Sequence, residues 1–307
     1  MVTRPAGADN PSIREHPIPT QGSKPYILTL GPDGNLWFCE SGTSKIGRLS
    51  PNDGTFAEFP VPTQGGQPIG IITGADGNLW FTEYSAHKIG RITLDGEITE
   101  FRLPTPNAGP NGIILGPDGN VWFSETDIGR MARITPRGVV TEYAAGISPG
   151  SQPLAIAVAD DDLWFSEAAG NRIGKITLDG IVSEFLAPTR NSGPRAIITG
   201  LDGNLWFVES TGNAIGRMDL RGNAVAFPLP CPGASPRGIA VAPSGEFWIT
   251  ENAVNRVARM SSTGKILTEY TLPTKQSGPR AIIVIPDGRV FFSQHDAGQI
   301  GEIIPAK

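Results

Sequence analysis

The sequence predicts an all-β protein, and three of its features lead to this fold class. Large aromatic residues recur every 42 or 43 residues, at Trp37, Trp80, Trp122, Trp164, Trp206, Trp248 and Phe291. The 39 glycines and 28 prolines exceed average usage, yet 39% of the residues are hydrophobic, which indicates many tight turns around a sizeable core. Asp-Gly and related turn pairs separate short apolar runs in the repeats, as is typical of β-hairpins.

Each repeat contains four short segments that fit strands. An apolar run follows a proline, and a turn such as PDGN leads to a segment such as LWFTE (Leu79–Glu83). A segment such as KIGRI, a second Asp-Gly turn and a segment such as ITEF complete the unit. Four strands repeated every forty-odd residues are typical of a propeller blade, so seven repeats predict a seven-bladed β-propeller.

The two ends of the chain complete one repeat. The last repeat stops after its third segment, IGEIIPAK, whereas residues 12–18 (SIREHPI) resemble the fourth segment of the others. A solenoid would instead need polar capping repeats at both ends. We therefore expect residues 1–11 to be an N-terminal extension and residues 12–307 to form a single domain. In this domain the N-terminal strand joins the last blade, closes the ring and leaves no open sheet edge.

Charge and apolar patterning argue against several classes of partner. The net charge is −5 and the basic residues are scattered, which does not match the electrostatic footprint of a nucleic-acid-binding protein. Apolar runs of about five residues are too short to span a bilayer, and the N-terminus has no apolar core of a secretion signal. Cys39 and Cys231 match neither a disulfide framework nor a metal-ligand spacing. We expect a cytoplasmic monomer with a small-molecule partner, no nucleic acid and no membrane.

Three arginines interrupt an otherwise apolar position. The residue after the repeated proline opens the innermost strand, which lines the central channel; in chain order it is Tyr26, Ile69, Asn111, Leu154, Arg195, Arg237 and Arg280. An isolated buried ion costs several kcal/mol, so each arginine needs water, a carboxylate or an anionic ligand. Guanidinium groups bind carboxylates and phosphates bidentately and do not act as bases. We predict that Arg195, Arg237 and Arg280, together with Asn111, bind an anion or a polarised carbonyl.

A ring of acidic residues is expected at the same rim. The second segments end in Glu40, Glu83, Glu125, Glu167, Glu209, Glu251 and Gln294. Antiparallel pairing places these ends beside the start of the innermost strands, and we expect Arg280 to lie opposite His295. Because this brings the second-strand ends close to the arginines, Glu209, Glu251 and Gln294 are predicted to contact the substrate. Two alternatives stay open. The glutamates can serve only to hold the blades together, and the arginines can form inter-blade salt bridges with them.

Proton transfer near neutral pH needs a group such as histidine, and the chain has three. His16 lies on the outer closing strand, where we expect a solvated side chain. His87 replaces the asparagine of the GN turns in other repeats, so we expect a turn residue. His295 follows Gln294 at the rim, one blade from Tyr26. We predict that His295 and Tyr26 are the catalytic residues.

Two repeats carry a specific resemblance to a known family. The segments NLWFTEYSAHKIGRITLDGEITEF (Asn78–Phe101) and NLWFVESTGNAIGRM (Asn204–Met218) resemble the streptogramin B lyases, also called virginiamycin B lyases. The likeness runs from about Ser12 to Ile304. It implies a seven-bladed propeller with its active site at the channel mouth. Those enzymes open a cyclic depsipeptide by elimination across its ester linkage, with a histidine base and a magnesium ion.

The chain departs from the family at the residues that carry this chemistry. The family's catalytic histidine follows the repeated proline of the last blade, and a substrate-binding histidine occupies the same position one blade earlier; these positions hold Arg280 and Arg237 here. The metal-binding glutamate corresponds to Gly278, and the second metal-ligand position falls around Gln294 and His295. An arginine-lined site repels hard cations, which want several oxygen ligands, so we expect no metal and no other cofactor.

These observations predict a metal-independent elimination on a small anionic or ester/carbonyl substrate bound at the arginine-lined funnel. One alternative is a propeller that binds a ligand or peptide without chemistry. Another is a lactonase-type hydrolase. That reaction would need a calcium site of Glu, Asn and Asp in the channel, of which Asn111 with Glu125 is only a fragment.

Overall fold

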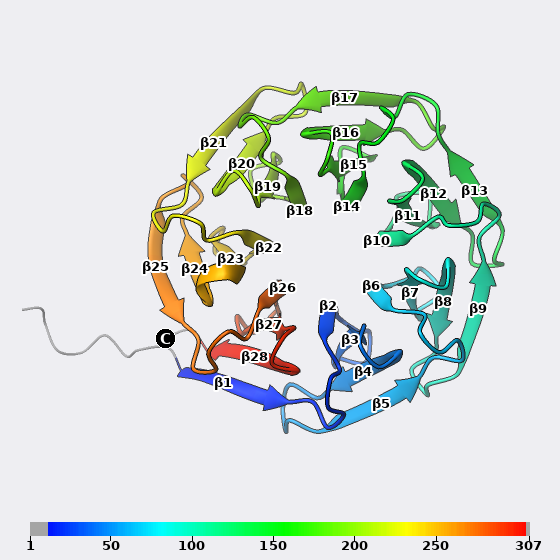
Figure 1. Cartoon of the computed structure of the whole chain (residues 1–307), viewed down its shortest axis with the longest axis horizontal. Helices are drawn as coiled ribbons and strands as arrows, with labels where there is room; N and C mark the ends of the chain where they lie inside the picture. The colour runs from blue at the N-terminus through cyan, green and yellow to red at the C-terminus, as the bar shows by residue number, and fades with distance from the viewer. Residues whose placement is uncertain (1–11, 305–307) are drawn as a thin grey trace, which may run out of the picture.

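A computed structural model describes residues 12–304 and confirms the predicted fold. Seven four-stranded antiparallel sheets surround a central axis as the blades of a propeller (Figure 1). The predicted extension, residues 1–11, and the last three residues of the predicted domain lie outside the described residues. No helix among residues 12–304 is both long and apolar enough to cross a membrane.

Within each blade the four strands lie side by side, in order from the propeller axis to the outer edge. The innermost strands are β2 (Pro25–Leu30), β6 (Pro68–Thr73), β10 (Pro110–Leu115), β14 (Pro153–Ala159), β18 (Pro194–Thr199), β22 (Pro236–Val241) and β26 (Pro279–Val284). The second strands are β3 (Leu36–Glu40), β7 (Leu79–Glu83), β11 (Val121–Glu125), β15 (Asp162–Glu167), β19 (Leu205–Glu209), β23 (Phe247–Glu251) and β27 (Val290–Gln294). A single 3-10 turn, η1 (Asn252–Val254), follows β23 within the described part of the chain.

The third and fourth strands form the outer half of each blade. The third strands are β4 (Lys45–Leu49), β8 (Lys88–Ile92), β12 (Arg130–Ile134), β16 (Arg172–Ile176), β20 (Ala214–Met218), β24 (Arg256–Met260) and β28 (Gln299–Ile304). The outermost strands are β5 (Phe56–Pro60), β9 (Ile98–Arg102), β13 (Val140–Tyr143), β17 (Val182–Leu186), β21 (Ala224–Pro228), β25 (Ile266–Thr271) and β1 (Ser12–Pro17).

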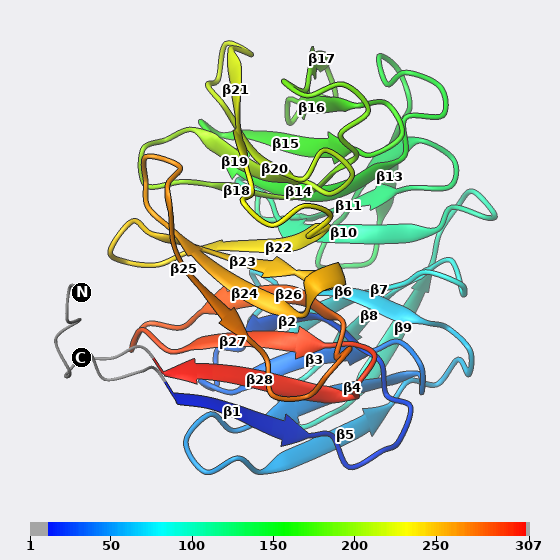
Figure 2. The ribbon, with the colours of Figure 1, turned by 60° about the vertical axis from the view of Figure 1, so that its left-hand side comes forward.

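The N-terminal strand closes the ring as predicted. Strand β1 pairs antiparallel with β28, from Ser12 opposite Ile304 to Pro17 opposite Gln299, and the two lie side by side in both ribbon views (Figures 1 and 2). Each end of the chain therefore contributes strands to one sheet, and unfolding either end opens the ring.

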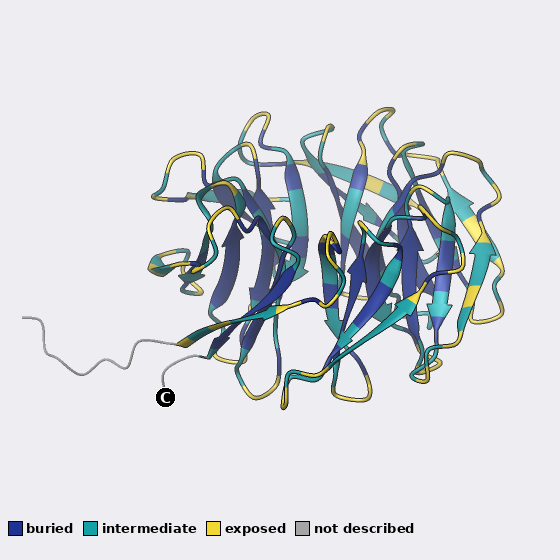
Figure 3. Ribbon diagram, turned by 60° about the horizontal axis from the view of Figure 1, so that its bottom comes forward, coloured by how far each residue is buried: buried dark blue, intermediate teal, exposed yellow. Residues whose placement is uncertain are grey.

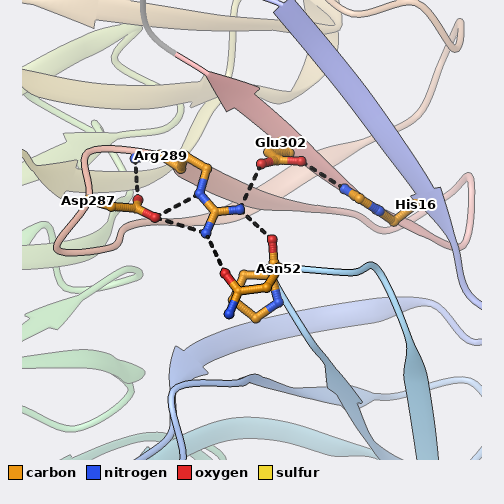
Figure 4. A network of polar contacts seen from close by, with 6 residues as sticks. His16, Asn52, Asp287, Arg289 and Glu302 are labelled. Carbon is orange, nitrogen blue, oxygen red and sulfur yellow. Dashed lines mark hydrogen bonds and ion pairs between the residues drawn. The ribbon is translucent and has the colours of Figure 1, made fainter.

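A buried carboxylate joins the two ends at this closure (Figure 4). Glu302 is almost fully buried; its Oε2 lies 3.0 Å from His16 Nε2, and its Oε1 lies 3.3 Å from Arg289 Nη1. The Arg289 guanidinium also donates to the carbonyl oxygen of Pro51 in the first blade. The expectation of a solvated His16 is therefore wrong, because strand pairing brings its ring against Glu302.

The tryptophans pack between blades, as their repetition indicates. Trp37 is fully buried, donates its Nε1–H to Asp33 of the preceding turn at 3.0 Å and stacks on Phe59 with centroids 5.4 Å apart. Phe38 points to the opposite face of the strand, and Gly47 makes room for it, because a Cβ atom there would lie 2.2 Å from the Phe38 ring. Buried residues fill the blades and exposed residues gather in the connecting loops (Figure 3).

Every innermost strand carries a bulge near its start. In the seventh blade Pro279 pairs with Gln294 and Ile282 with Phe292, so Arg280 and Ala281 oppose the single residue Ser293. The same register shift follows the proline of all seven innermost strands. The expected pairing of Arg280 with His295 is therefore wrong. The turn closes with Ile285 opposite Arg289, one residue away from the expected register, and the bulge then shifts the pairing again and changes the direction of the side chains.

A hydroxyl from the second strand satisfies the backbone at this bulge. The Ser293 hydroxyl accepts a 3.1 Å bond from the Ala281 N–H, and Thr82 does the same for the Gly70 N–H at 2.9 Å. A buried N–H without a partner is costly. The Ser or Thr that precedes the glutamate in most repeats thus supports the bulge that sets the direction of the channel residues.

Candidate functional site

The innermost strands enclose a cavity on the propeller axis. Its volume is about 270 Å³, and residues from all seven innermost strands line it. A second pocket, of about 490 Å³, adjoins it and shares Tyr26, Asn111, Leu154 and Arg280. Apart from Ile69 of β6, its other lining comes from residues that precede innermost strands or follow second strands, such as Gln67. We call the first the central cavity and the second the mouth pocket.

Arg195, Arg237 and Arg280 line the central cavity from three adjacent blades. No carboxylate of residues 12–304 lies within ion-pair distance of their guanidinium groups. The Nε atoms of Arg237 and Arg280 are buried without a hydrogen-bond partner among these residues. The described part of the chain thus gives no support to the alternative of inter-blade salt bridges, and the charge of the three arginines is not neutralised.

The arginines also influence one another and a neighbouring ring. Burial lowers the pKa of Arg237, and the positive charges of Arg195 and Arg280 lower it further. The guanidinium carbon of Arg280 lies 5.0 Å from the centre of the Tyr26 ring, within the range of a cation–π contact. A ligand anion placed here would relieve repulsion among three like charges.

His295 lies in the mouth pocket beside this cluster. Its Nδ1 is 2.7 Å from Asp296 Oδ1, and its ring meets the edge of Tyr26 with centroids 5.9 Å apart. Its side chain is only 11% exposed. Burial and the nearby Arg280 lower its pKa, against the opposite effect of Asp296. With the Nδ1 proton directed at Asp296, Nε2 is left with a free lone pair and can act as a base.

The structure does not bring Glu209, Glu251 and Gln294 to the channel with the arginines. All three are fully buried, and none lines the central cavity or the mouth pocket. Glu209 instead accepts bonds from the Thr189 N–H and hydroxyl, at 3.3 and 2.6 Å. The predicted rim arrangement is corrected here, because the bulge directs the residue after the proline to the axis while its neighbour across the ladder stays inside the blade.

Most of the repeated glutamates are instead buried inside the blades beside a second, partly exposed glutamate. In five blades the glutamate that ends the second strand adjoins a glutamate of the outermost strand: the pairs are Glu40 with Glu58, Glu83 with Glu100, Glu125 with Glu142, Glu167 with Glu184, and Glu251 with Glu269. Burial and the second carboxylate raise the pKa of Glu83 to about 8. One acid of such a pair keeps its proton at neutral pH, consistent with a role in holding the blade together.

Sequence reasoning missed Asp296 and the polar residues of the mouth. The Tyr84 hydroxyl donates a 2.7 Å bond to Asp127, and both residues line the mouth pocket. Asp296 follows His295 directly in the chain, so its role as a hydrogen-bond partner of His295 could have been predicted from the sequence. The Tyr84 contact joins residues 43 positions apart on neighbouring blades and had no local signal.

Comparison with known proteins identifies the family. The model of the virginiamycin B lyase family matches residues 8–159 and 147–307. The chain belongs to the virginiamycin B lyase family. Its structure is similar to one described as a streptogramin B lyase structure, with a TM-score of 0.91 and 36% identity over 96% of this chain and 97% of the other.

Two further structures extend the comparison. The virginiamycin B lyase of Staphylococcus aureus in its selenomethionine form has a TM-score of 0.90 and 36% identity, covering 96% of this chain and 99% of the other. A catalytically inactive histidine-to-alanine variant of that lyase with quinupristin gives the same values. No curated protein sequence matches the chain.

The residues of this family member do not fit the magnesium ion that the resemblance implies. Gly278 offers no side-chain ligand, and Arg280 brings a positive charge. The Gln294 amide nitrogen donates to Glu15 and to the Ser277 hydroxyl, at 2.9 and 3.1 Å. No group of three or more His, Cys, Asp or Glu suited to a metal occurs within the described 12–304 range. These side chains therefore do not form a site for that ion.

Proposed function

We propose that the protein is a lyase that opens a carbon–oxygen bond by β-elimination without a metal. The substrate is a small anionic or ester/carbonyl compound held where the central cavity meets the mouth pocket. The observation that carries this proposal is that His295, in contact with Asp296 and with its pKa lowered by burial and by Arg280, adjoins arginines with no counter-charge among the described residues. Membership in the virginiamycin B lyase family supports the reaction type.

In the proposed step His295 Nε2 removes the proton from the carbon next to a substrate carbonyl. The carbonyl oxygen gains negative charge, and the guanidinium groups of Arg280 and Arg237 stabilise it. The electron pair then forms a carbon–carbon double bond as the bond between the β-carbon and its oxygen breaks. That oxygen leaves with the bonding pair, and no water is consumed.

Tyr26 is placed to assist the departing oxygen. Its ring contacts both Arg280 and His295, and it lines both pockets. Its hydroxyl can donate a hydrogen bond to the leaving group, which favours bond breaking. Arg195 and Asn111 complete the lining on the other blades and orient the substrate.

The test is a screen of depsipeptides, esters and small carboxylates in water enriched in oxygen-18. We expect a product that contains a new double bond and no heavy oxygen. The variant His295→Ala should lose turnover by at least about a hundredfold, whereas His87→Ala, at a turn residue that lines neither cavity, should retain it. Incorporation of oxygen-18 would instead show a hydrolase, and saturable binding without turnover would show a binding protein; either result overturns the proposal.

A further inference from the structure

The central cavity is apolar apart from the cluster near its mouth. The innermost strands line it with apolar residues that keep part of their surface exposed: Ile27, Ile72, Leu154, Ala196, Ile198, Ala281 and Ile283. Within the described residues the three arginines are the only charged side chains that line this cavity. The cavity therefore presents a cationic end and an apolar interior.

The three arginines lie at one level of the channel. Each directly follows the proline that opens β18, β22 or β26, so equivalent strand positions on three adjacent blades present one guanidinium each. A single negative charge would leave the other cations unpaired in a site with buried Nε atoms. Two negative charges on one ligand match this arrangement better, because guanidinium groups bind the oxygens of carboxylates and phosphates in bidentate fashion.

We propose that the central cavity binds an amphipathic dianion. Its head group, a dicarboxylate or a phosphate monoester, contacts Arg195, Arg237 and Arg280, and its aliphatic or aromatic part enters the apolar interior of the cavity. This inference rests on the proposed function only in placing the substrate in the same cavity, and it names the chemical class of that substrate. The bound anion supplies the counter-charge that the described residues do not.

Titration calorimetry with matched probes tests both halves of the ligand. Succinate carries the charges alone, phenylsuccinate adds an apolar group, phenylsuccinamide removes the charges, and phenyl phosphate replaces the dicarboxylate. We expect phenylsuccinate to bind at least about tenfold more tightly than succinate, because burial of a phenyl group contributes more than 1.4 kcal/mol. The neutral diamide should show no measurable binding. A preference for phenyl phosphate over phenylsuccinate would assign a phosphate head group, and the reverse a dicarboxylate.

Variants of the chain assign the site. Arg237→Gln removes the middle charge and should weaken phenylsuccinate binding at least about tenfold. The matched control Arg102→Gln changes an exposed arginine of β9 and should leave binding unchanged. Ala196→Leu narrows the apolar interior and should weaken phenylsuccinate but not succinate.

Equal binding of the diamide and the diacid would overturn the inference, as would equal binding of succinate and phenylsuccinate. An equal loss in both arginine variants would also overturn it. The calorimetric binding results do not depend on whether the protein converts a substrate. A chain that eliminates neutral esters and ignores the dianions contradicts this inference alone, whereas one that binds dianions and converts no compound contradicts only the proposed function.

Discussion

The side-chain amide of Gln294 donates a 2.9 Å hydrogen bond to the carboxylate of Glu15 inside the seventh blade. Five other blades place two glutamates at these positions, and burial beside a second acid raises the pKa of the first to about 7 or 8. In the fifth blade Ala226 replaces the second acid. The amide of Gln294 therefore donates the bond that a protonated glutamate donates elsewhere.

Glu83→Gln should stabilise the protein at alkaline pH. The pKa of Glu83 is raised from 4.5 to about 8 in the folded chain, so stability is lost as the pH rises through this interval, by roughly 1.4 kcal/mol per pH unit. Glutamine does not titrate and keeps the bond to Glu100. The gain in free energy of unfolding, measured with urea, should be larger at pH 9 than at pH 6.

Glu209→Gln is the matched control for that substitution. Glu209 accepts two bonds from Thr189 and has no acidic partner on the outer strand. A glutamine there can still accept from the Thr189 N–H and can donate to the Thr189 hydroxyl, but neutral bonds replace two bonds to a carboxylate, so the variant should lose about 1 kcal/mol. If Glu83→Gln and Glu209→Gln changed the free energy of unfolding in the same direction, a proton held between two carboxylates would not account for the stability of the glutamate pairs.

Arg237→Met should stabilise the free protein while it removes anion binding. The Arg237 guanidinium lies between two like charges, and its Nε is buried without a partner among the described residues. Replacement by an apolar side chain of similar length should raise the free energy of unfolding by about 1 kcal/mol in low-salt buffer. Urea unfolding measures this change, and a clear loss of stability would show that the arginine is already neutralised.

The pKa of His295 should respond in opposite directions to its two charged neighbours. Asp296 raises it and Arg280 lowers it, so Asp296→Asn should move the titration to lower pH and Arg280→Met should move it to higher pH. An NMR titration of the imidazole signals resolves this, because the chain has only three histidines. A shift in the same direction in both variants would contradict the site geometry.

Glu302→Ala should weaken the closure of the ring. Glu302 is 1% exposed and binds both His16 and Arg289. Its loss leaves the partly buried His16 ring without its acceptor, whereas Arg289 keeps other acceptors such as Asp287, so the variant should lose about 1–3 kcal/mol. Glu97→Ala, at an exposed turn, is the control and should change stability by less than about 0.5 kcal/mol. Equal losses in the two variants would mean that this network does not secure the chain ends.

The sequence alone predicted the ring, because each repeat records the same turns and the same buried aromatic position. Closure by β1 followed from the missing fourth strand of the last repeat. The arginines were found for the same reason, as departures from a repeated position that faces the axis.

The acidic residues could not be placed in this way. Their position relative to the arginines depends on a one-residue bulge of the innermost strand, which directs the residue after the proline to the axis while the glutamate across the ladder stays inside the blade. The Ser or Thr before the glutamate is the signal of that bulge, but its meaning is clear only once the Ser293 hydroxyl is seen to accept from the Ala281 N–H. The contact between His16 and Glu302 joins residues 286 positions apart, beyond the reach of local patterns.

A crystal structure of the protein grown with selenate, with anomalous scattering from selenium used to locate the anion, tests the central claim most directly. We predict an anomalous peak within hydrogen-bond distance of the guanidinium groups of Arg195, Arg237 and Arg280. An empty cavity in which these guanidinium groups pair with carboxylates of the protein would contradict the account.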